Sequence, residues 1–175
     1  GDFELAGALI WLDFPAITGR GRIATLDGWL DSIGPDRTAR IPALILSRIH
    51  REIIMGRGEE AHYWLSVAER EIEESSDSRG DLLVARAMIG IDGPKGMIEN
   101  ATRAADLLAQ TDPWQIPAKL FCGIGMFLEE DAGAERYLRD ASREAVAISP
   151  AFHALALSQL ALCVLEQGRP QEAFD

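Results

Sequence analysis

The sequence predicts an all-α fold in which antiparallel helix pairs stack into a superhelical array. No stretch of the 175 residues alternates apolar and polar side chains with the period of two that a half-buried strand needs, whereas helical spacing occurs throughout. Glycine and proline mark the breaks between the helical stretches. The ranges expected to be helical are 3–13, 22–32, 39–56, 59–74, 80–91, 95–110, 114–129, 132–148 and 151–167, with a further start at 170.

Two of the breaks carry helix-capping signals. Asp112 precedes Pro113 and Ser149 precedes Pro150, which places an N-cap residue directly before proline at the first helical position. Proline costs nothing there because its missing N–H has no partner inside the helix. New helices are therefore expected to begin at both points.

A short pattern recurs at the start of the second helix of each pair. An alanine is followed by large and small residues at i+4 and i+7, which lie on one helical face. Small residues there allow two antiparallel helices to approach closely. The two complete copies are Ala61, Leu65, Ala68 and Ala134, Leu138, Ala141. Weaker copies are expected at Ile98, Thr102, Ala105 and at Ala24, with Ala101 an alternative starting point to Ile98.

Composition excludes several classes of function. The formal net charge is −11, so contact with nucleic acid or an anionic membrane is disfavoured. The longest apolar stretch, 154–165, is too short to span a bilayer. Cys122 and Cys163 lie in apolar helical runs, where a free cysteine behaves as a small apolar residue. These features predict a cytoplasmic protein, and the chain ends indicate a segment, 1–175, of a longer one.

The helix pairs resemble the tetratricopeptide repeat, a helical repeat that stacks into an α-solenoid. A narrower resemblance covers most of the chain: the runs 21–33 (GRIATLDGWLDSI) and 61–69 (AHYWLSVAE) are similar to the helical sensor region of MalT-like regulators, which are large ATP-dependent transcription factors of the LuxR type. The resemblance implies a repeat domain between a nucleotide-binding module and a helix-turn-helix. The sequence contains neither a phosphate-binding loop nor a basic DNA-reading helix.

Candidate binding residues lie on the first helices of the pairs, which line the concave groove in tetratricopeptide-like proteins. Most are cationic, which favours an anionic small molecule or an acidic peptide as the ligand. The alternative is that the arginines of the 39–56 helix form ion pairs with the acidic helix at 59–74. The candidate groove residues are Arg48, His50, Arg51, Arg86, Lys119 and Gln159.

The predicted function is a regulatory segment of a LuxR/MalT-type regulator that binds an effector or a protein partner on its concave face. The alternative is a protein-interaction scaffold in an unrelated multidomain signalling protein. The sequence offers no arrangement of catalytic residues, its three histidines lack metal-ligand spacing, and no cofactor is expected. Self-association into a homo-oligomer stays open, as does the identity of the ligand.

Overall fold

The computed structural model describes residues 2–73 and 76–173. Every regular element in these ranges is helical, and no strand occurs among them. The helices are α1 (Phe3–Gly19), α2 (Ile23–Ile33), α3 (Pro35–Thr38), α4 (Pro42–Ile54), α5 (Gly58–Glu71), α6 (Arg79–Ile89), α7 (Gly93–Leu107), α8 (Gln115–Leu128), α9 (Ala134–Ala145) and α10 (Pro150–Glu166), followed by the 3₁₀ turn η1 (Pro170–Ala173). The all-α prediction is confirmed.

Each predicted helical range overlaps one of these helices, with two differences at the N-terminal end. The predicted end of the 59–74 range lies outside the described residues, and the start at 170 is a 3₁₀ turn. Helix α1 continues through Pro15 to Gly19, although proline normally ends a helix. The burial of Phe14, Pro15 and Ile17 on one side of α1 offsets the lost backbone hydrogen bond. The short helix α3 was not predicted, and the Thr38 hydroxyl closes it by donating to the Gly34 carbonyl at 3.0 Å.

The repeated small–large–small face is buried in both complete copies, at Ala61, Leu65, Ala68 and at Ala134, Leu138, Ala141. The phases expected from Ile98 and from Ala24 were wrong, whereas the alternative starting point, Ala101, is buried. Helix α7 buries Met97, Ala101 and Ala104, one residue earlier than expected, and Ala24 is exposed while Leu26, Leu30 and Ile33 are buried. In an alanine-rich helix, neighbouring faces carry similar side chains, so the sequence defines the buried face poorly.

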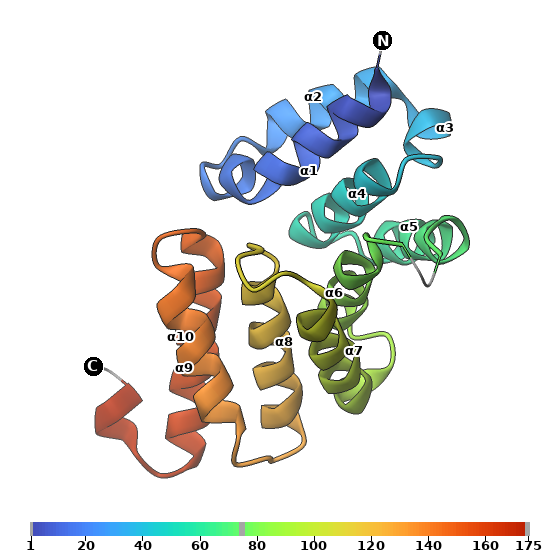
Figure 1. Cartoon of the computed structure of the whole chain (residues 1–175). Helices are drawn as coiled ribbons and strands as arrows, with labels where there is room; N and C mark the ends of the chain where they lie inside the picture. Colours follow the sequence, from blue (N-terminus) through green and yellow to red (C-terminus); the bar gives the residue numbers. More distant parts are fainter. Residues whose placement is uncertain (1, 74–75, 174–175) are drawn as a thin grey trace.

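Helices α6 to α10 form a row in which each helix packs against the next, and α8, α9 and α10 run in alternating directions (Figure 1). Close approach within the row requires small residues. A Cβ atom at Gly125 of α8 would lie 2.9 Å from the Pro94 carbonyl oxygen of α7, well inside van der Waals contact. Alternate helices also touch, because α4 contacts α6, α6 contacts α8, and α8 contacts α10.

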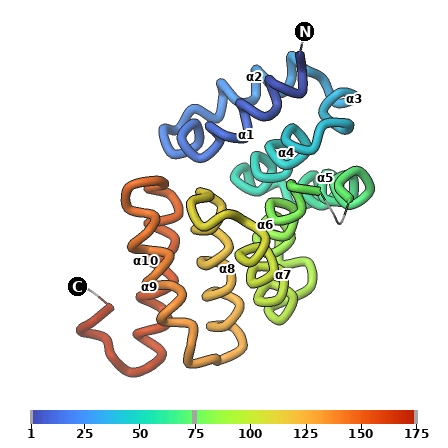
Figure 2. Tube along the Cα trace, in the orientation of Figure 1, coloured from blue at the N-terminus to red at the C-terminus, as the bar shows by residue number. Residues whose placement is uncertain are grey.

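The first hairpin, α1 and α2, lies across one end of this row (Figures 1 and 2). Helix α1 packs on α4, and its far end reaches the beginning of α10, where a Cβ atom at Gly19 would lie 3.6 Å from Cδ of Pro150. One hydrophobic cluster accordingly joins residues of α1 and α2 to α4, α6, α7 and α8. The hairpin therefore contacts helices far along the chain as well as its neighbours.

Candidate functional site

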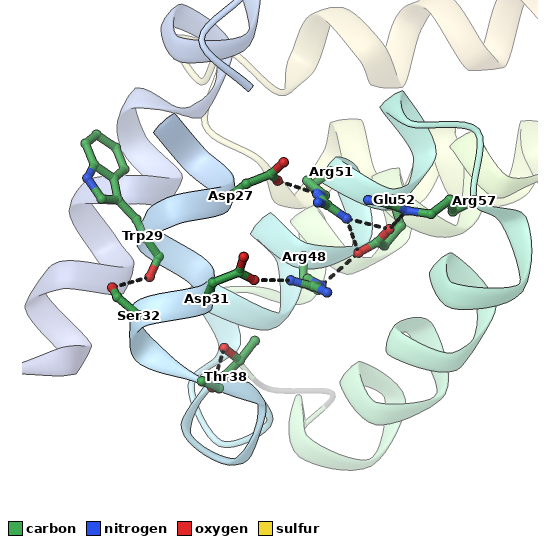
Figure 3. Close-up of polar contacts among 10 residues, drawn as sticks. Asp27, Trp29, Asp31, Ser32, Thr38, Arg48, Arg51, Glu52 and Arg57 are labelled. Atoms are coloured by element: carbon green, nitrogen blue, oxygen red, sulfur yellow. Dashed lines mark hydrogen bonds and ion pairs between the residues drawn. The ribbon is translucent and has the colours of Figure 1, made fainter. Parts of the chain in front are cut away.

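The arginines predicted to form a cationic patch on α4 converge on one buried carboxylate. Glu52 is only 1% exposed. Its carboxylate oxygens lie 2.8 Å from Nε of Arg48, 2.9 Å from an Nη atom of Arg51 and 2.5 Å from Nε of Arg57 (Figure 3). Burying Glu52 without these cations would be costly, because an isolated charge loses its hydration.

The same arginines also bind helix α2. Asp27 lies 2.5 Å from Nε of Arg51, and Asp31 lies 3.8 Å from Arg48 (Figure 3). The hydrogen bond that Arg51 donates to Asp27, together with the nearby Glu52 carboxylate, raises the pKa of Arg51. Asp27, which comes before Asp31 in α2, pairs with Arg51, which comes after Arg48 in α4. Helices α2 and α4 therefore run antiparallel at this contact. We refer to Asp27, Asp31, Arg48, Arg51, Glu52 and Arg57 as the α2–α4 ion-pair network.

This network corrects the expected partner of the α4 arginines. The acidic residues of α5 do not pair with Arg48 or Arg51. Helix α5 instead presents Trp64, whose ring centroid lies 5.9 Å from the Arg48 guanidinium. The sequence does contain the matching signal: Asp27 and Asp31 are four residues apart on one face of α2, and Arg48 and Arg51 are three apart on one face of α4.

His50 is enclosed by aromatic rings and is only 1% exposed. Its ring centroid lies 4.4 Å from that of Trp114, 5.1 Å from Trp11 and 5.8 Å from Phe14. Its Nδ1–H donates to the Leu46 carbonyl at 2.9 Å. Burial lowers the pKa of His50 to about 4, so the ring is neutral at physiological pH. The prediction that His50 lines an open groove is wrong, because α1 covers this face of α4.

The remaining candidates lie on separate helices and are partly buried. Arg86 of α6 pairs with Glu69 of α5 and with Asp92 at 2.6 Å, and this contact lowers the pKa of Asp92. Lys119 of α8 pairs with Glu144 of α9 at 2.7 Å. Gln159 lies on α10. Each named cation on a first helix is thus neutralised by an acid, in most cases one from another helix.

A groove between α1 and α2 was not anticipated from the sequence. Its volume is about 730 Å³, and its lining is mainly apolar: Phe3, Ala6, Leu9, Ile10, Leu12, Asp13, Trp29, Ser32 and Ile33. Trp29 is 43% exposed. It lies on the side of α2 away from the two aspartates that face α4 (Figure 3). The signal in the sequence was the spacing of Leu5, Leu9 and Leu12.

Two other kinds of site were sought in the described residues. Within residues 2–73 and 76–173, no group of three or more His, Cys, Asp or Glu side chains is placed to hold a metal ion. No helix in these ranges is long and apolar enough to cross a bilayer. Both cysteines, Cys122 and Cys163, are buried free thiols, and burial raises the pKa of each.

The fold and these surfaces define an all-helical protein of packed neighbouring helices. Comparison with protein-family models, with curated proteins and with solved structures finds no match to this chain.

Proposed function

We propose that this chain is a tetratricopeptide-like superhelical array that acts as the binding and regulatory segment of a large LuxR/MalT-type transcription regulator. The observation that carries the proposal is the contact pattern of the helices. The first helices α4, α6, α8 and α10 contact one another in succession, whereas no comparable contact joins α5 to α7 or α7 to α9 among the described residues. Closer contact between the first helices supports a curved stack with these helices on its concave side.

The concave face is the proposed binding surface for an effector or a protein partner. Its partly exposed polar residues include Arg86, Lys119 and Gln159. Arg86 and Lys119 already hold carboxylates, so an anionic group on a ligand would exchange with Asp92 or Glu144. The same two cations therefore serve as anchors for a small anion or for an acidic side chain of a partner. The segment itself is proposed to work in the cytoplasm without catalysis, without cofactor, and without touching nucleic acid or membrane.

The second candidate function is a protein-interaction scaffold within an unrelated signalling protein. The open apolar groove on the first hairpin favours it, because exposed apolar surface on a folded protein marks interaction sites. The two proposals differ in the ligand: a regulator senses a small effector, and a scaffold holds another protein.

A thermal-shift screen of the purified chain against anionic metabolites tests the leading proposal. A true effector raises the melting temperature, since it binds only the folded state. Its effect should be lost in the double variant Arg86→Gln/Lys119→Gln and kept in Arg70→Gln, a control at an exposed arginine of α5. Failure of every metabolite, together with saturable binding of a partner protein, would favour the scaffold. Nucleotide hydrolysis abolished by a point mutation in this chain would overturn both.

A further inference from the structure

Helix α1 is apolar around its whole circumference, yet one side of it is uncovered. Its only charged residues are Glu4 and Asp13. One side packs into the core through Ile10, Phe14 and Ile17. Such a helix is normally buried on all sides. The opposite side instead exposes a stripe of leucines with i, i+4, i+7 spacing: Leu5, Leu9 (56% exposed) and Leu12 (73% exposed).

Two leucines of this exposed stripe line one wall of the α1–α2 groove. Leu9 and Leu12 stand on the α1 side, Trp29 stands on the α2 side, and buried Ile10 and Ile33 contribute to the floor. The lining extends along α1 from Phe3 to Asp13, which at 1.5 Å per residue makes the groove about 15 Å long. This length corresponds to about three turns of a second helix lying alongside.

Among the residues that line the groove, the one charged side chain, Asp13, is acidic. Arg20 and Arg22 lie in the turn between the two helices. Helices α1 and α2 contain four acidic residues and no lysine, arginine or histidine. Two of the four, Asp27 and Asp31, face the arginines of α4. Asp13 lines the groove and pairs with no cation there, since neither lysine nor arginine is among the lining residues. At the opposite end, Arg37 of α3 stacks on Phe3, with its guanidinium 4.5 Å from the ring centroid.

We propose that the α1–α2 groove binds an amphipathic helix of a partner protein, with leucine-like side chains on one face and lysine or arginine beside them. The apolar face of the partner fills the space between Leu9, Leu12 and Trp29, as in other helix-in-groove complexes. Its basic residues lie against Asp13. This site is on the first hairpin and does not depend on the proposed role of the concave face.

The test uses two synthetic peptides of about 15 residues, the length of about four helical turns. Both carry leucine at i, i+3, i+4 and i+7; one has lysine at the remaining positions and its twin has glutamate. Binding to the purified chain is followed by fluorescence anisotropy. The basic peptide should bind at least about tenfold more tightly than the acidic twin, and its affinity should fall with added salt.

One substitution separates groove binding from general attraction to an acidic protein. Leu12→Glu makes the chain more negative, so attraction by net charge alone would increase, whereas a groove that needs Leu12 would lose affinity by about tenfold or more. Leu162→Glu on α10 is the matched control, because it adds the same charge at another exposed leucine. Asp13→Lys should weaken binding of the basic peptide and strengthen binding of the acidic twin. Asp106→Lys, at an exposed position of α7, should change both affinities much less.

Three results would overturn the proposal. Equal binding of the basic peptide by Leu12→Glu and Leu162→Glu would show that net charge holds the peptide. Equal binding of the two peptides by the parent chain would remove the role of Asp13. A dimer of the parent chain that dissociates in Leu12→Glu would identify a second copy of this chain as the occupant. Circular dichroism and the melting temperature confirm that each variant is folded.

Discussion

The indole rings of Trp11 and Trp114 are stacked face to face, with centroids 4.3 Å apart and planes inclined by 6°. Trp11 belongs to α1, and Trp114 is the residue that precedes α8. The pair therefore joins the first hairpin to the middle of the helical row. His50 packs against both rings, so the stacked pair also covers the face of α4 that carries His50.

Replacing Trp114 by alanine should destabilise the protein by about 3–5 kcal/mol, the usual cost of removing a buried tryptophan. The loss includes the stack with Trp11 and the packing against His50. Urea unfolding measures the change. Trp29→Ala removes the same side chain at an exposed position and should cost less than about 1 kcal/mol. Similar losses in the two variants would contradict the assigned role of Trp114.

The double charge reversal Arg48→Glu/Arg51→Glu should lower the free energy of unfolding by about 3–5 kcal/mol or more, since breaking a buried pair leaves an uncompensated charge. Glu52 would then be buried beside two further carboxylates. The reversal Arg139→Glu/Arg143→Glu, at exposed arginines of α9, should cost only about 1 kcal/mol. If the Arg48→Glu/Arg51→Glu variant is as stable as the parent, these arginines are not needed for folding and are available to bind a ligand.

Two buried groups beside the Trp11 ring should influence stability with opposite dependence on pH. Burial and the nearby Asp112 carboxylate raise the pKa of Asp81 to about 7, while a hydrogen bond from Trp11 acts in the other direction. Between about pH 4 and 7 the native state thus holds a proton that unfolded Asp81 has lost. Its contribution to stability increases as the pH falls through this range, by up to about 1.4 kcal/mol per unit.

His50 acts in the opposite sense, because its native pKa of about 4 lies below the ordinary value of 6.5. Between these values the unfolded state holds the extra proton, so stability decreases as the pH falls. In the parent chain the two contributions oppose each other. From pH 7 to pH 5, Asp81→Asn should lose stability relative to the parent, whereas His50→Phe should gain it. Urea unfolding at both pH values measures the differences, and parallel behaviour of the two variants would refute this account.

Ala134→Trp should cost about 1–3 kcal/mol or more, because Ala134 is buried where α9 packs on α8 and a larger side chain must separate them. Ala132→Trp is the control, since Ala132 is exposed in the preceding turn and should leave the melting temperature nearly unchanged. A fully stable Ala134→Trp variant would show that the two helices do not cross at this residue.

Local signals explain most of what the sequence predicted well. A capping residue before proline correctly predicted the start of α10 at Ser149, whose hydroxyl accepts the backbone N–H of Phe152. The same signal at Asp112 and Pro113 was two residues early, because α8 begins at Gln115. The alanine spacing identified the buried faces of α5 and α9. The environment of His50 was not predictable in this way, because it depends on the packing of α1 against α4. Residue spacing within a single helix does not indicate such a contact. The partners of Arg48 and Arg51 include aspartates of the preceding helix, α2, whereas the predicted partners were on the following one.

The position of the first hairpin has a consequence for how the chain folds during synthesis. Residues of α1 leave the ribosome before Trp114 and the start of α10, against which they pack. Contacts between distant parts of a chain slow folding, because the intervening loop must be closed before they form. The apolar surface of α1 is therefore exposed while most of the chain is being made, and exposed surface of this kind promotes aggregation. Folding to completion must await the last third of the sequence.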